Sequence, residues 1–345
     1  MSFKLERYWK GLYMIISWNT TQACNISCVH CYRDAGTKRN DELSTEEGKK
    51  LLDEMARAGF KIIILSGGEP LMRSDIFELI SYAKSIGLRP VLGTNGILIT
   101  KDVAIKLKEA GLGAAGISLD SRDKNIHDKF RQSEGAWDKT IAAMKACREV
   151  GLPFQVHTTI TTWNEKEVTD ITDLAVEVGA MAHHIFFLVP TGRGKDIEDT
   201  TLKTEQYEAV LTRILEKQKE VSIELKPTCA PQFMRIAKER NIPMRFTRGC
   251  LAGTAYCVIL PNGDVQACPY LPIKIGNVHE TDFDVLWRDS EMFNKLRHEP
   301  LKGGCGTCGY DKICGGCRAR AYYYYEGDYM AEEPWCDRGV REVKK

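Results

Sequence analysis

The sequence lacks the long apolar runs and the excess charge that mark membrane and nucleic-acid-binding proteins. No apolar run approaches the roughly 18 residues that span a bilayer, and the longest, Ile62–Leu65 and Ile185–Val189, have the length of strands. The 48 Lys and Arg residues nearly balance the 47 Asp and Glu residues, so a net charge of +1 gives no general attraction to nucleic acid. The first residues also lack the apolar stretch of a signal peptide. We therefore expect a cytoplasmic protein that binds neither nucleic acid nor membrane.

Cysteine, in contrast, is abundant and unevenly placed. An odd number of thiols, 13, argues against a disulfide framework in a chain expected in the cytoplasm. Three lie between positions 24 and 31 and eight between 250 and 336, and thiols gathered in this way usually hold metal. Cys147 falls within a predicted helix and is interpreted as a small buried side chain. Cys229 lies in a rigid loop between two prolines, where a role near a substrate is the less favoured interpretation.

The first two-thirds of the chain alternate between short apolar runs and amphipathic stretches. Strands are predicted at Tyr13–Trp18, Lys61–Leu65, Arg89–Gly93, Ala114–Leu119, Phe154–Ile160 and His184–Val189. Helices are predicted at Ser44–Ala58, Ser74–Ser85, Lys101–Glu109, Trp137–Val150 and Glu165–Val178. Six β/α repeats imply a parallel sheet with right-handed crossovers, an α/β fold that forms a partial, TIM-like (β/α)6 barrel. Ligands of such sheets bind at the carboxyl ends of the strands.

The composition changes after about residue 240. One more long helix, Leu202–Glu220, and a strand, Val221–Leu225, are predicted before that point. From about Thr247 the chain is rich in Gly and Cys and shows little periodicity, so bound metal has to help stabilise it. We predict two domains, residues 1–240 with the barrel and residues 241–345 as a small Cys-rich iron–sulfur domain.

The first cysteine cluster follows the first predicted strand, where Cys24, Cys28 and Cys31 form a CxxxCxxC segment. Three thiolates on one loop can bind three irons of a [4Fe–4S] cluster, which leaves one iron open to another ligand. An open metal position usually belongs to catalysis. The alternative is a zinc site completed by His30 or a distant residue, although the spacing fits common zinc patterns poorly.

This segment resembles the signature of the radical S-adenosylmethionine (radical SAM) superfamily, with His30 at the position of an aromatic residue. Residues 66–70 resemble the family's GGE motif, which binds the methionine amino group. The resemblance implies a catalytic [4Fe–4S] cluster on Cys24, Cys28 and Cys31, and SAM bound by residues at the strand ends. These residues are His30, Gly67, Gly68, Glu69, Thr94, Asn95, Ser118, Asp120, Arg131, Pro190 and Arg193. It also implies a reductant such as ferredoxin or flavodoxin.

The C-terminal cysteines resemble the SPASM extension of radical SAM enzymes, which carries one or two auxiliary [4Fe–4S] clusters. By this resemblance, Cys250, Cys257, Cys268 and Cys317 would hold one cluster, and Cys305, Cys308, Cys314 and Cys336 the other. Two residues separate Cys314 from Cys317 in this chain, whereas the SPASM pattern usually has three. The alternative is a zinc ribbon, because CxxC pairs are common zinc ligands.

Over the whole chain, the closest resemblance is to radical SAM enzymes of siroheme-dependent haem biosynthesis, the group that we identify as Fe-coproporphyrin III synthase, or haem b synthase. It implies a tetrapyrrole substrate, Fe-coproporphyrin III, whose propionate side chains are oxidatively decarboxylated to vinyl groups. Arg193, Lys195 and Arg318 are our candidates for binding the propionates. Tyr32 stands where these enzymes are expected to have arginine. His183 and His184 could face a bound iron, but packing at the strand is the favoured interpretation.

Three alternatives remain. The chain could be a related tetrapyrrole enzyme that removes acetate groups from didecarboxysiroheme. It could also be a SPASM maturase of peptides or proteins, although only about a dozen residues precede the first strand, too few for a peptide-recognition domain. The alternative without catalysis is an iron–sulfur electron carrier or a zinc-held binding module. Cleavage of SAM by the reduced protein distinguishes enzyme from carrier.

Overall fold

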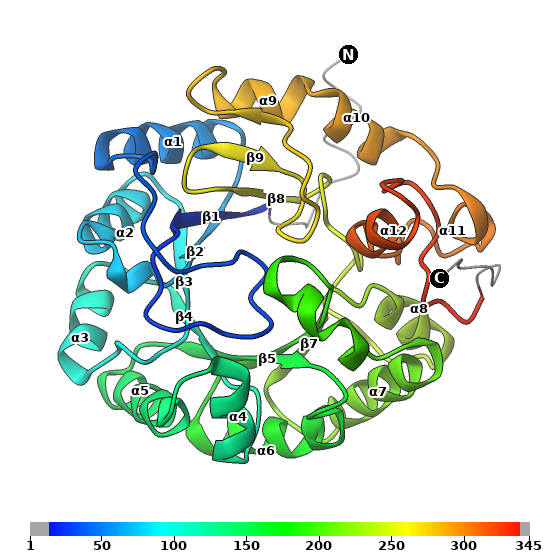
Figure 1. Cartoon of the computed structure of the whole chain (residues 1–345), viewed down its shortest axis with the longest axis horizontal. Helices are drawn as coiled ribbons and strands as arrows, with labels where there is room; N and C mark the ends of the chain where they lie inside the picture. Colours follow the sequence, from blue (N-terminus) through cyan, green and yellow to red (C-terminus); the bar gives the residue numbers. More distant parts are fainter. Residues whose placement is uncertain (1–13, 339–345) are drawn as a thin grey trace.

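Seven parallel strands form the centre of the fold, and a ring of helices covers their outer side (Figure 1). The computed structural model describes residues 14–338. The strands are β1 (Ile15–Thr21), β2 (Ile62–Gly67), β3 (Arg89–Thr94), β4 (Ala114–Ser118), β5 (Phe154–Ile160), β6 (Ala182–Phe187) and β7 (Glu224–Thr228). The helices that alternate with them are α1 (Thr45–Arg57), α2 (Ile76–Ser85), α3 (Lys101–Glu109), α5 (Ala136–Val150), α6 (Val168–Val178) and α7 (Thr204–Lys217). The predicted α/β fold of parallel β/α repeats is confirmed, although Tyr13 lies outside the described residues.

Local signals in the sequence explain where the helices begin and end. Ser44 caps α1 by accepting the backbone N–H of Glu47, whose carboxylate accepts the N–H of Ser44 at 2.8 Å in return. Gly151 and Gly179 end α5 and α6 with φ of 69° and 89°, a conformation that favours glycine. The short helix α4 (Lys124–Arg131) was not predicted, because its eight residues include only two apolar side chains, Ile126 and Phe130. Asp123 caps it by accepting the N–H groups of Asn125 and Ile126.

The C-terminal third extends the same sheet. β8 (Tyr256–Ile259) pairs in parallel with β1, and β9 (Asp264–Gln266) and β10 (Gly276–Asn277) continue from it in antiparallel order. The sheet therefore runs across the predicted domain boundary near residue 240. The helices are α8 (Gln232–Glu239), α9 (Phe283–Asp289), α10 (Glu291–His298), α11 (Gly303–Thr307) and α12 (Arg318–Tyr324), and α11 and α12 stand between α10 and α8 (Figure 1). Short 3-10 turns complete the fold: η2 (Pro70–Met72), η3 (Glu165–Glu167) and η4 (Gly192–Thr200).

Alternate residues of each strand separate the core from the barrel interior. Ile16 and Trp18 of β1 are fully buried against the outer helices, and α1 packs so closely that a Cβ at Gly48 would lie 2.5 Å from the Trp18 ring. Ser17 and Asn19, on the inner side of β1, are small and polar. The inner side of β1 is therefore polar, whereas its outer side packs in the apolar core.

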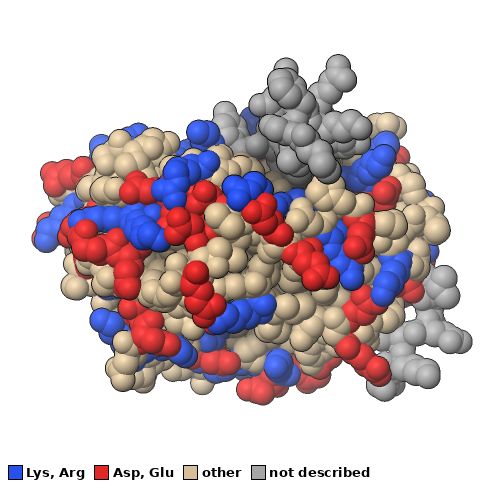
Figure 2. All heavy atoms as spheres, turned by 90° about the horizontal axis from the view of Figure 1, so that it is seen from above, with Lys and Arg blue, Asp and Glu red and all other residues tan. Residues whose placement is uncertain are grey.

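The outer surface carries both signs of charge. Lys and Arg side chains are interspersed with Asp and Glu side chains over the face seen in Figure 2. Within residues 14–338, none of the helices has the length and apolar character that crossing a membrane requires.

Candidate active site and thiol clusters

The first thiol cluster lies on the loop of residues 22–43, which leaves the carboxyl end of β1 and crosses the open end of the barrel (Figure 1). Two backbone hydrogen bonds close this loop on itself. Cys24 N–H donates to the carbonyl of Gly36 at 2.8 Å, and Gly36 N–H donates to the carbonyl of Gln22 at 2.9 Å. Cys24, Cys28 and Cys31 are thus held on one compact loop at the strand ends.

Arg193 fastens this loop to the segment after β6. Its Nε donates to the carbonyl of Cys28 at 2.9 Å and its Nη1 to the carbonyl of Ala35 at 3.0 Å, while its backbone N–H donates to the carbonyl of Cys31 at 2.9 Å. Gly192, with φ of 55°, allows the approach, because a Cβ there would lie 2.5 Å from the Cys31 oxygen. Arg193 therefore positions the cysteine loop, and these bonds occupy the guanidinium that we predicted would bind SAM or a propionate.

A buried ion pair lies beneath Cys28. Arg131 Nε is 2.7 Å from Asp120 Oδ2, and Arg131 Nη1 is 3.7 Å from the Cys28 sulfur. Burial raises the pKa of the Asp120 carboxyl, but the Arg131 guanidinium outweighs this effect and holds it below its ordinary value. Burial lowers the pKa of His30 to about 3, so His30 is neutral, and its ring packs edge-on against Phe130 at 5.4 Å. The cation nearest the Cys28 thiol is thus Arg131.

The GGE segment packs directly against the beginning of the cysteine loop. A Cβ at Gly68 would lie 2.1 Å from the Ala23 oxygen, and one at Gly67 would lie 2.4 Å from the Thr21 oxygen. Both positions therefore need glycine. Glu69 N–H donates to the carbonyl of Ala23 at 2.7 Å. The glycines that we predicted to allow close approach of SAM allow close approach of this backbone.

Glu69 is a fully buried carboxylate at the end of β2. It accepts hydrogen bonds from Thr94 Oγ1 at 2.8 Å and from the backbone N–H of Asn95 at 2.9 Å. Burial raises its pKa to about 7. A cationic ligand beside this carboxylate would offset the cost of its burial.

The remaining predicted residues lie at the same end of the barrel as Glu69 and Thr94. Ser118 Oγ donates to the carbonyl of Thr94 at 3.2 Å, and Asn95 Nδ2 donates to Oδ1 of Asn25 on the cysteine loop at 2.8 Å. Pro190 is buried just before Gly192. The structure therefore gathers the predicted residues at one end of the barrel, and it adds Asn25, which no recognised motif had indicated.

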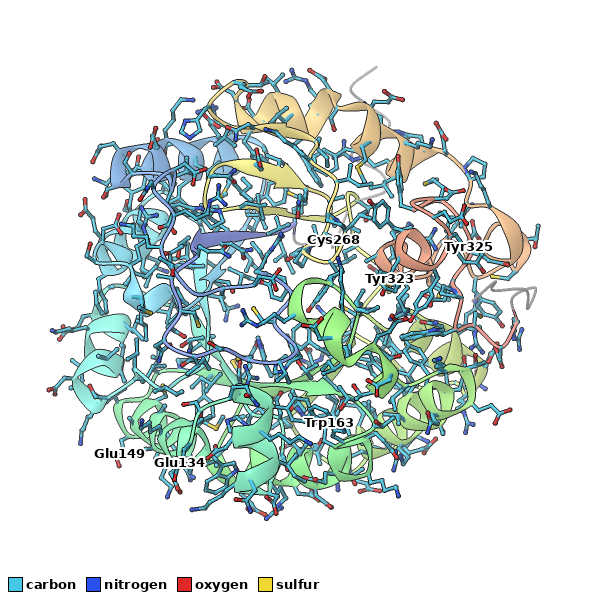
Figure 3. All side chains as sticks on the ribbon, viewed as in Figure 1. Glu134, Glu149, Trp163, Cys268, Tyr323 and Tyr325 are labelled. Atoms are coloured by element: carbon cyan, nitrogen blue, oxygen red, sulfur yellow. The ribbon has the colours of Figure 1, made fainter. Side chains whose placement is uncertain are left out.

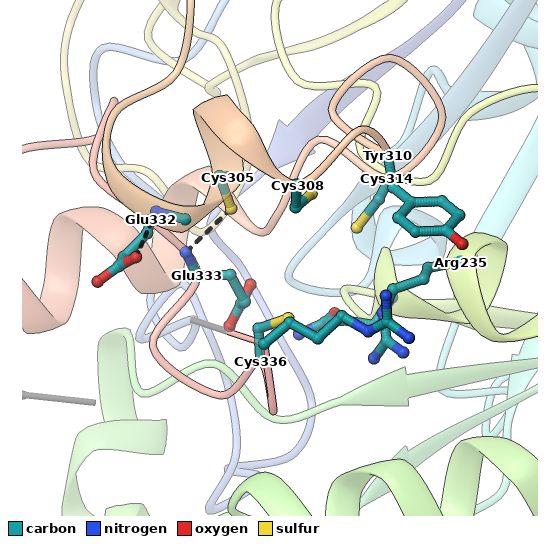
Figure 4. Close-up of a pocket in the computed structure, with 11 residues that line it drawn as sticks. Arg235, Cys305, Cys308, Tyr310, Cys314, Glu332, Glu333 and Cys336 are labelled. Atoms are coloured by element: carbon teal, nitrogen blue, oxygen red, sulfur yellow. Dashed lines mark hydrogen bonds between the residues drawn. The ribbon is translucent and has the colours of Figure 1, made fainter. Parts of the chain in front are cut away.

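A second thiol cluster lies in the C-terminal region. Cys305, Cys308, Cys314 and Cys336 line one pocket, as predicted for one auxiliary set, and their sulfurs lie around the same space in Figure 4. Cys305 Sγ accepts the backbone N–H of Glu333 at 3.2 Å.

The other predicted set is divided. The charges of Cys250 and Cys317 act on the Cys268 thiol, whose pKa is raised by burial and then by these thiols, so the three lie near one another. Figure 3 shows Cys268 inside the ring of outer helices. Cys257 points from β8 to the outer face of the sheet, away from these three thiols. Burial raises the pKa of the Cys257 thiol, and the charge of Arg297 of α10 lowers that pKa. The structure therefore does not bring Cys257 together with the other three thiols.

Two of the predicted substrate cations are unsuited to that role. Arg318 Nη1 donates to the carbonyls of Tyr329 and Ala331 at 2.9 and 2.7 Å inside the protein, and Lys195 is exposed on the surface. His183 faces the helices, where its ring nitrogens pair with the hydroxyls of Thr158 and Thr172. This arrangement agrees with the packing interpretation of His183.

A further polar group faces the barrel interior, and it includes His184, for which we favoured packing at the strand. The rings of His157 and His184 stack with centroids 5.2 Å apart, and Gly116 makes room for them, because a Cβ there would lie 2.2 Å from the His157 ring. Lys226 of β7 is half-buried beside them and lies 4.9 Å from the Phe246 ring. It makes no ion pair with a carboxylate of residues 14–338, and His184 Nε2 is buried there without a hydrogen-bond partner.

Among residues 14–338, no three His, Cys, Asp or Glu side chains lie close enough together to share one metal ion. The thiols that hold a four-iron cluster bind different irons and do not share one ion.

Comparison with known proteins agrees with both parts of the chain. A model of the Radical SAM superfamily matches residues 18–175, and the SPASM model, described as an iron-sulfur cluster-binding domain, matches residues 250–317. An AdoMet-dependent heme synthase of Methanosarcina barkeri is 44% identical, with 93% of this chain and 95% of that protein covered. The Fe-coproporphyrin III synthase of the same organism is 33% identical, with 95% and 89% covered. Heme synthase and Fe-coproporphyrin III synthase are therefore two different proteins, although we had used both names for one group. The heme synthase shares more identical residues with this chain.

Among solved structures, Streptococcus suis SuiB bound to its precursor peptide SuiA superimposes with a TM-score of 0.78 at 19% identity, covering 97% of this chain and 79% of that one. At that identity the likeness concerns the fold alone.

Proposed function

The chain belongs to the radical SAM superfamily and carries a SPASM domain, and from this premise we propose that it is a haem synthase that oxidatively decarboxylates two propionate side chains of Fe-coproporphyrin III to vinyl groups. One observation carries the proposal: the near full-length likeness, at 44% identity, to a protein named for haem synthesis. The likeness to the Fe-coproporphyrin III synthase is weaker, at 33%, which favours haem formation over the preceding step.

The radical SAM domain implies SAM and a [4Fe–4S] cluster, and the SPASM domain implies auxiliary iron–sulfur clusters. When bound, SAM and its cluster supply a 5′-deoxyadenosyl radical that removes a hydrogen atom from an unreactive carbon. The residues present fit these groups. Arg131 would stabilise the thiolate of Cys28, one of three thiols that we propose as iron ligands with Cys24 and Cys31. Glu69 offers a buried carboxylate to the ammonium of methionine.

The reaction fixes what the protein must provide. Each propionate, –CH2–CH2–COO⁻, loses one hydrogen atom from its β-carbon, then one electron and CO2, and becomes –CH=CH2. Bound SAM would supply the chemistry that removes the hydrogen atom, and the electron would need an acceptor of the iron–sulfur class that the SPASM domain implies. The protein must therefore hold the β-carbon close to SAM and the carboxylate against a cation.

Lys226 is our candidate for that cation. It extends into the barrel interior from the side of β7 opposite to the buried Leu225. Burial lowers its pKa, since no carboxylate of the described residues forms an ion pair with it. A propionate would supply the missing anion, and the neutral rings of His157 and His184 would flank it.

The test is an anaerobic incubation of the reconstituted protein with SAM, dithionite and either Fe-coproporphyrin III or didecarboxysiroheme. We expect Fe-coproporphyrin III alone to yield a porphyrin lighter by two CO2 and four hydrogen atoms when both are weighed as neutral acids, two from the β-carbons and two from the carboxyl groups, together with 5′-deoxyadenosine. Formation of Fe-coproporphyrin III from didecarboxysiroheme would assign the chain to the preceding step. SAM cleavage with neither porphyrin changed would contradict the proposal.

A further inference from the structure

Cys229 has a backbone conformation that few residues other than glycine adopt. Its φ is 59°, a conformation that strains any residue with a Cβ. Two hydrogen bonds hold its carbonyl in place: Arg320 Nη1 donates at 2.6 Å and the Tyr207 hydroxyl at 3.1 Å. Such strain persists where the surroundings require one direction of the side chain.

The residue that holds Cys229 also holds Cys317. Arg320 Nε pairs with Oε1 of Glu333 at 2.7 Å, and Glu333 Oε2 accepts the backbone N–H of Cys317 at 2.6 Å. Arg320 and Glu333 are both almost completely buried. A buried pair with this many hydrogen bonds fixes its partners rigidly, so the backbones of Cys229 and Cys317 are fixed relative to each other.

Cys250 approaches the same place from the segment before β8. Gly249 packs on the loop that follows Cys229, since a Cβ there would lie 2.6 Å from the Pro231 oxygen. Cys250 N–H donates to the carbonyl of Cys314 at 3.0 Å, three residues before Cys317. The loop that carries Cys229 therefore meets the segments that carry Cys250 and Cys317, the two thiols near Cys268.

Cys257 has a different neighbourhood. The hydroxyl of Tyr256 donates to Ser17 Oγ at 2.8 Å on the inner side of the sheet. Because successive strand residues point to opposite faces, Cys257 faces outward. On that side lies Arg297 of α10, whose guanidinium stacks 4.1 Å from the Trp287 ring. Bringing Cys257 to the inner side would require a register shift of β8 against β1.

We propose that Cys229, and not Cys257, is the fourth thiolate of the auxiliary iron–sulfur cluster held by Cys250, Cys268 and Cys317. The cluster is then closed, with a protein ligand on every iron, which suits electron transfer without ligand exchange. Lys226 lies in β7, three residues before Cys229, so the end of one strand would join the candidate substrate cation to the cluster. The ligand assignment goes beyond the proposed function and holds whichever substrate the enzyme uses.

The test compares Cys229→Ala and Cys257→Ala in the full-length protein, reconstituted anaerobically, with Cys268→Ala as the positive control. Iron and sulfide are counted per chain, and the EPR spectrum of the reduced protein is recorded. We expect Cys257→Ala to match the wild type. We expect Cys229→Ala, like Cys268→Ala, to lose about four irons or to change the auxiliary signal.

Cys229→Ser guards against loss of fold, because its hydroxyl preserves the size of the side chain and can ligate iron weakly. We expect it to keep a native circular dichroism spectrum and to change the auxiliary EPR signal. Loss of iron in Cys257→Ala with an unchanged Cys229→Ala would overturn the assignment. A full iron content and an unchanged EPR spectrum in both alanine variants would also overturn the assignment. These readouts need no porphyrin, so they succeed or fail separately from the proposed function.

Discussion

The Arg131 guanidinium lies 3.7 Å from the Cys28 sulfur, and this proximity makes the cation part of the proposed cluster environment. Positive charge near a cluster favours its reduced, more negative state. Replacing Arg131 with Gln should therefore lower the reduction potential of the SAM-binding cluster. At a given concentration of reductant a smaller fraction of the cluster is then reduced, and SAM cleavage should slow by about tenfold, the equivalent of roughly 1.4 kcal/mol. Redox titration followed by EPR measures the potential.

Asp120→Asn provides the matched comparison, because it removes the anion that pairs with Arg131 at 2.7 Å. We expect the potential to shift in the opposite direction, since less of the cation's charge is neutralised. A shift of the same sign in both variants would show that they act through structural damage.

Glu69 should make stability depend on pH in the absence of SAM. Its pKa is raised from an ordinary 4.5 to about 7 by burial, so the protonated form is favoured by folding. The stabilisation is fully present below about pH 4.5 and is lost as the pH rises through 7, a change of the order of 3 kcal/mol. Glu69→Gln cannot ionise and escapes this loss. The thermal midpoint of the variant, relative to that of the wild type, should therefore be higher at pH 8 than at pH 5. The exposed Glu46→Gln is the control, and an equal midpoint difference for Glu69→Gln at both pH values would refute this.

Lys226→Met should weaken the binding of Fe-coproporphyrin III by about tenfold or more, because a buried carboxylate would lose its charged partner. SAM cleavage without porphyrin should change little. The exposed Lys195→Met is the control and should bind the porphyrin normally. Normal binding by Lys226→Met, measured by absorbance titration, would remove Lys226 from the substrate site.

Arg320→Met should destabilise the protein by about 3–5 kcal/mol, since Glu333 would be left buried without its cation. The double variant Arg320→Met with Glu333→Gln should recover part of that loss, because no uncompensated charge remains. Denaturant unfolding under anaerobic conditions measures both. Additive losses would mean that the two residues are not coupled.

The barrel and the end of it that carries the site were predictable from the sequence, but the partners of individual side chains were not. Alternating apolar runs and terminal glycines mark β1–β6 and their helices, and the motif residues follow these strands directly. Arg193 and Arg318 were expected to meet substrate because they are cations near motifs. Their hydrogen bonds to backbone carbonyls depend on how distant loops pack.

The auxiliary ligands show the same limit. The resemblance to SPASM domains groups Cys257 with Cys250 and Cys268, yet the face that Cys257 occupies depends on β8, a four-residue strand that was not predicted. Lys226 lies in β7 and Cys229 directly after it, more than twenty residues before the first auxiliary cysteine. Only tertiary packing brings Cys229 to the auxiliary thiols.

The most direct test of the account is the EPR spectrum of the reduced, iron-reconstituted protein before and after SAM is added. If Cys24, Cys28 and Cys31 hold a cluster with one open iron, SAM should change the spectrum in the wild type. The Cys28→Ala variant should lose the SAM-sensitive signal while keeping the auxiliary signals. A wild-type spectrum that is indifferent to SAM, or zinc in place of iron at these thiols, would contradict the account.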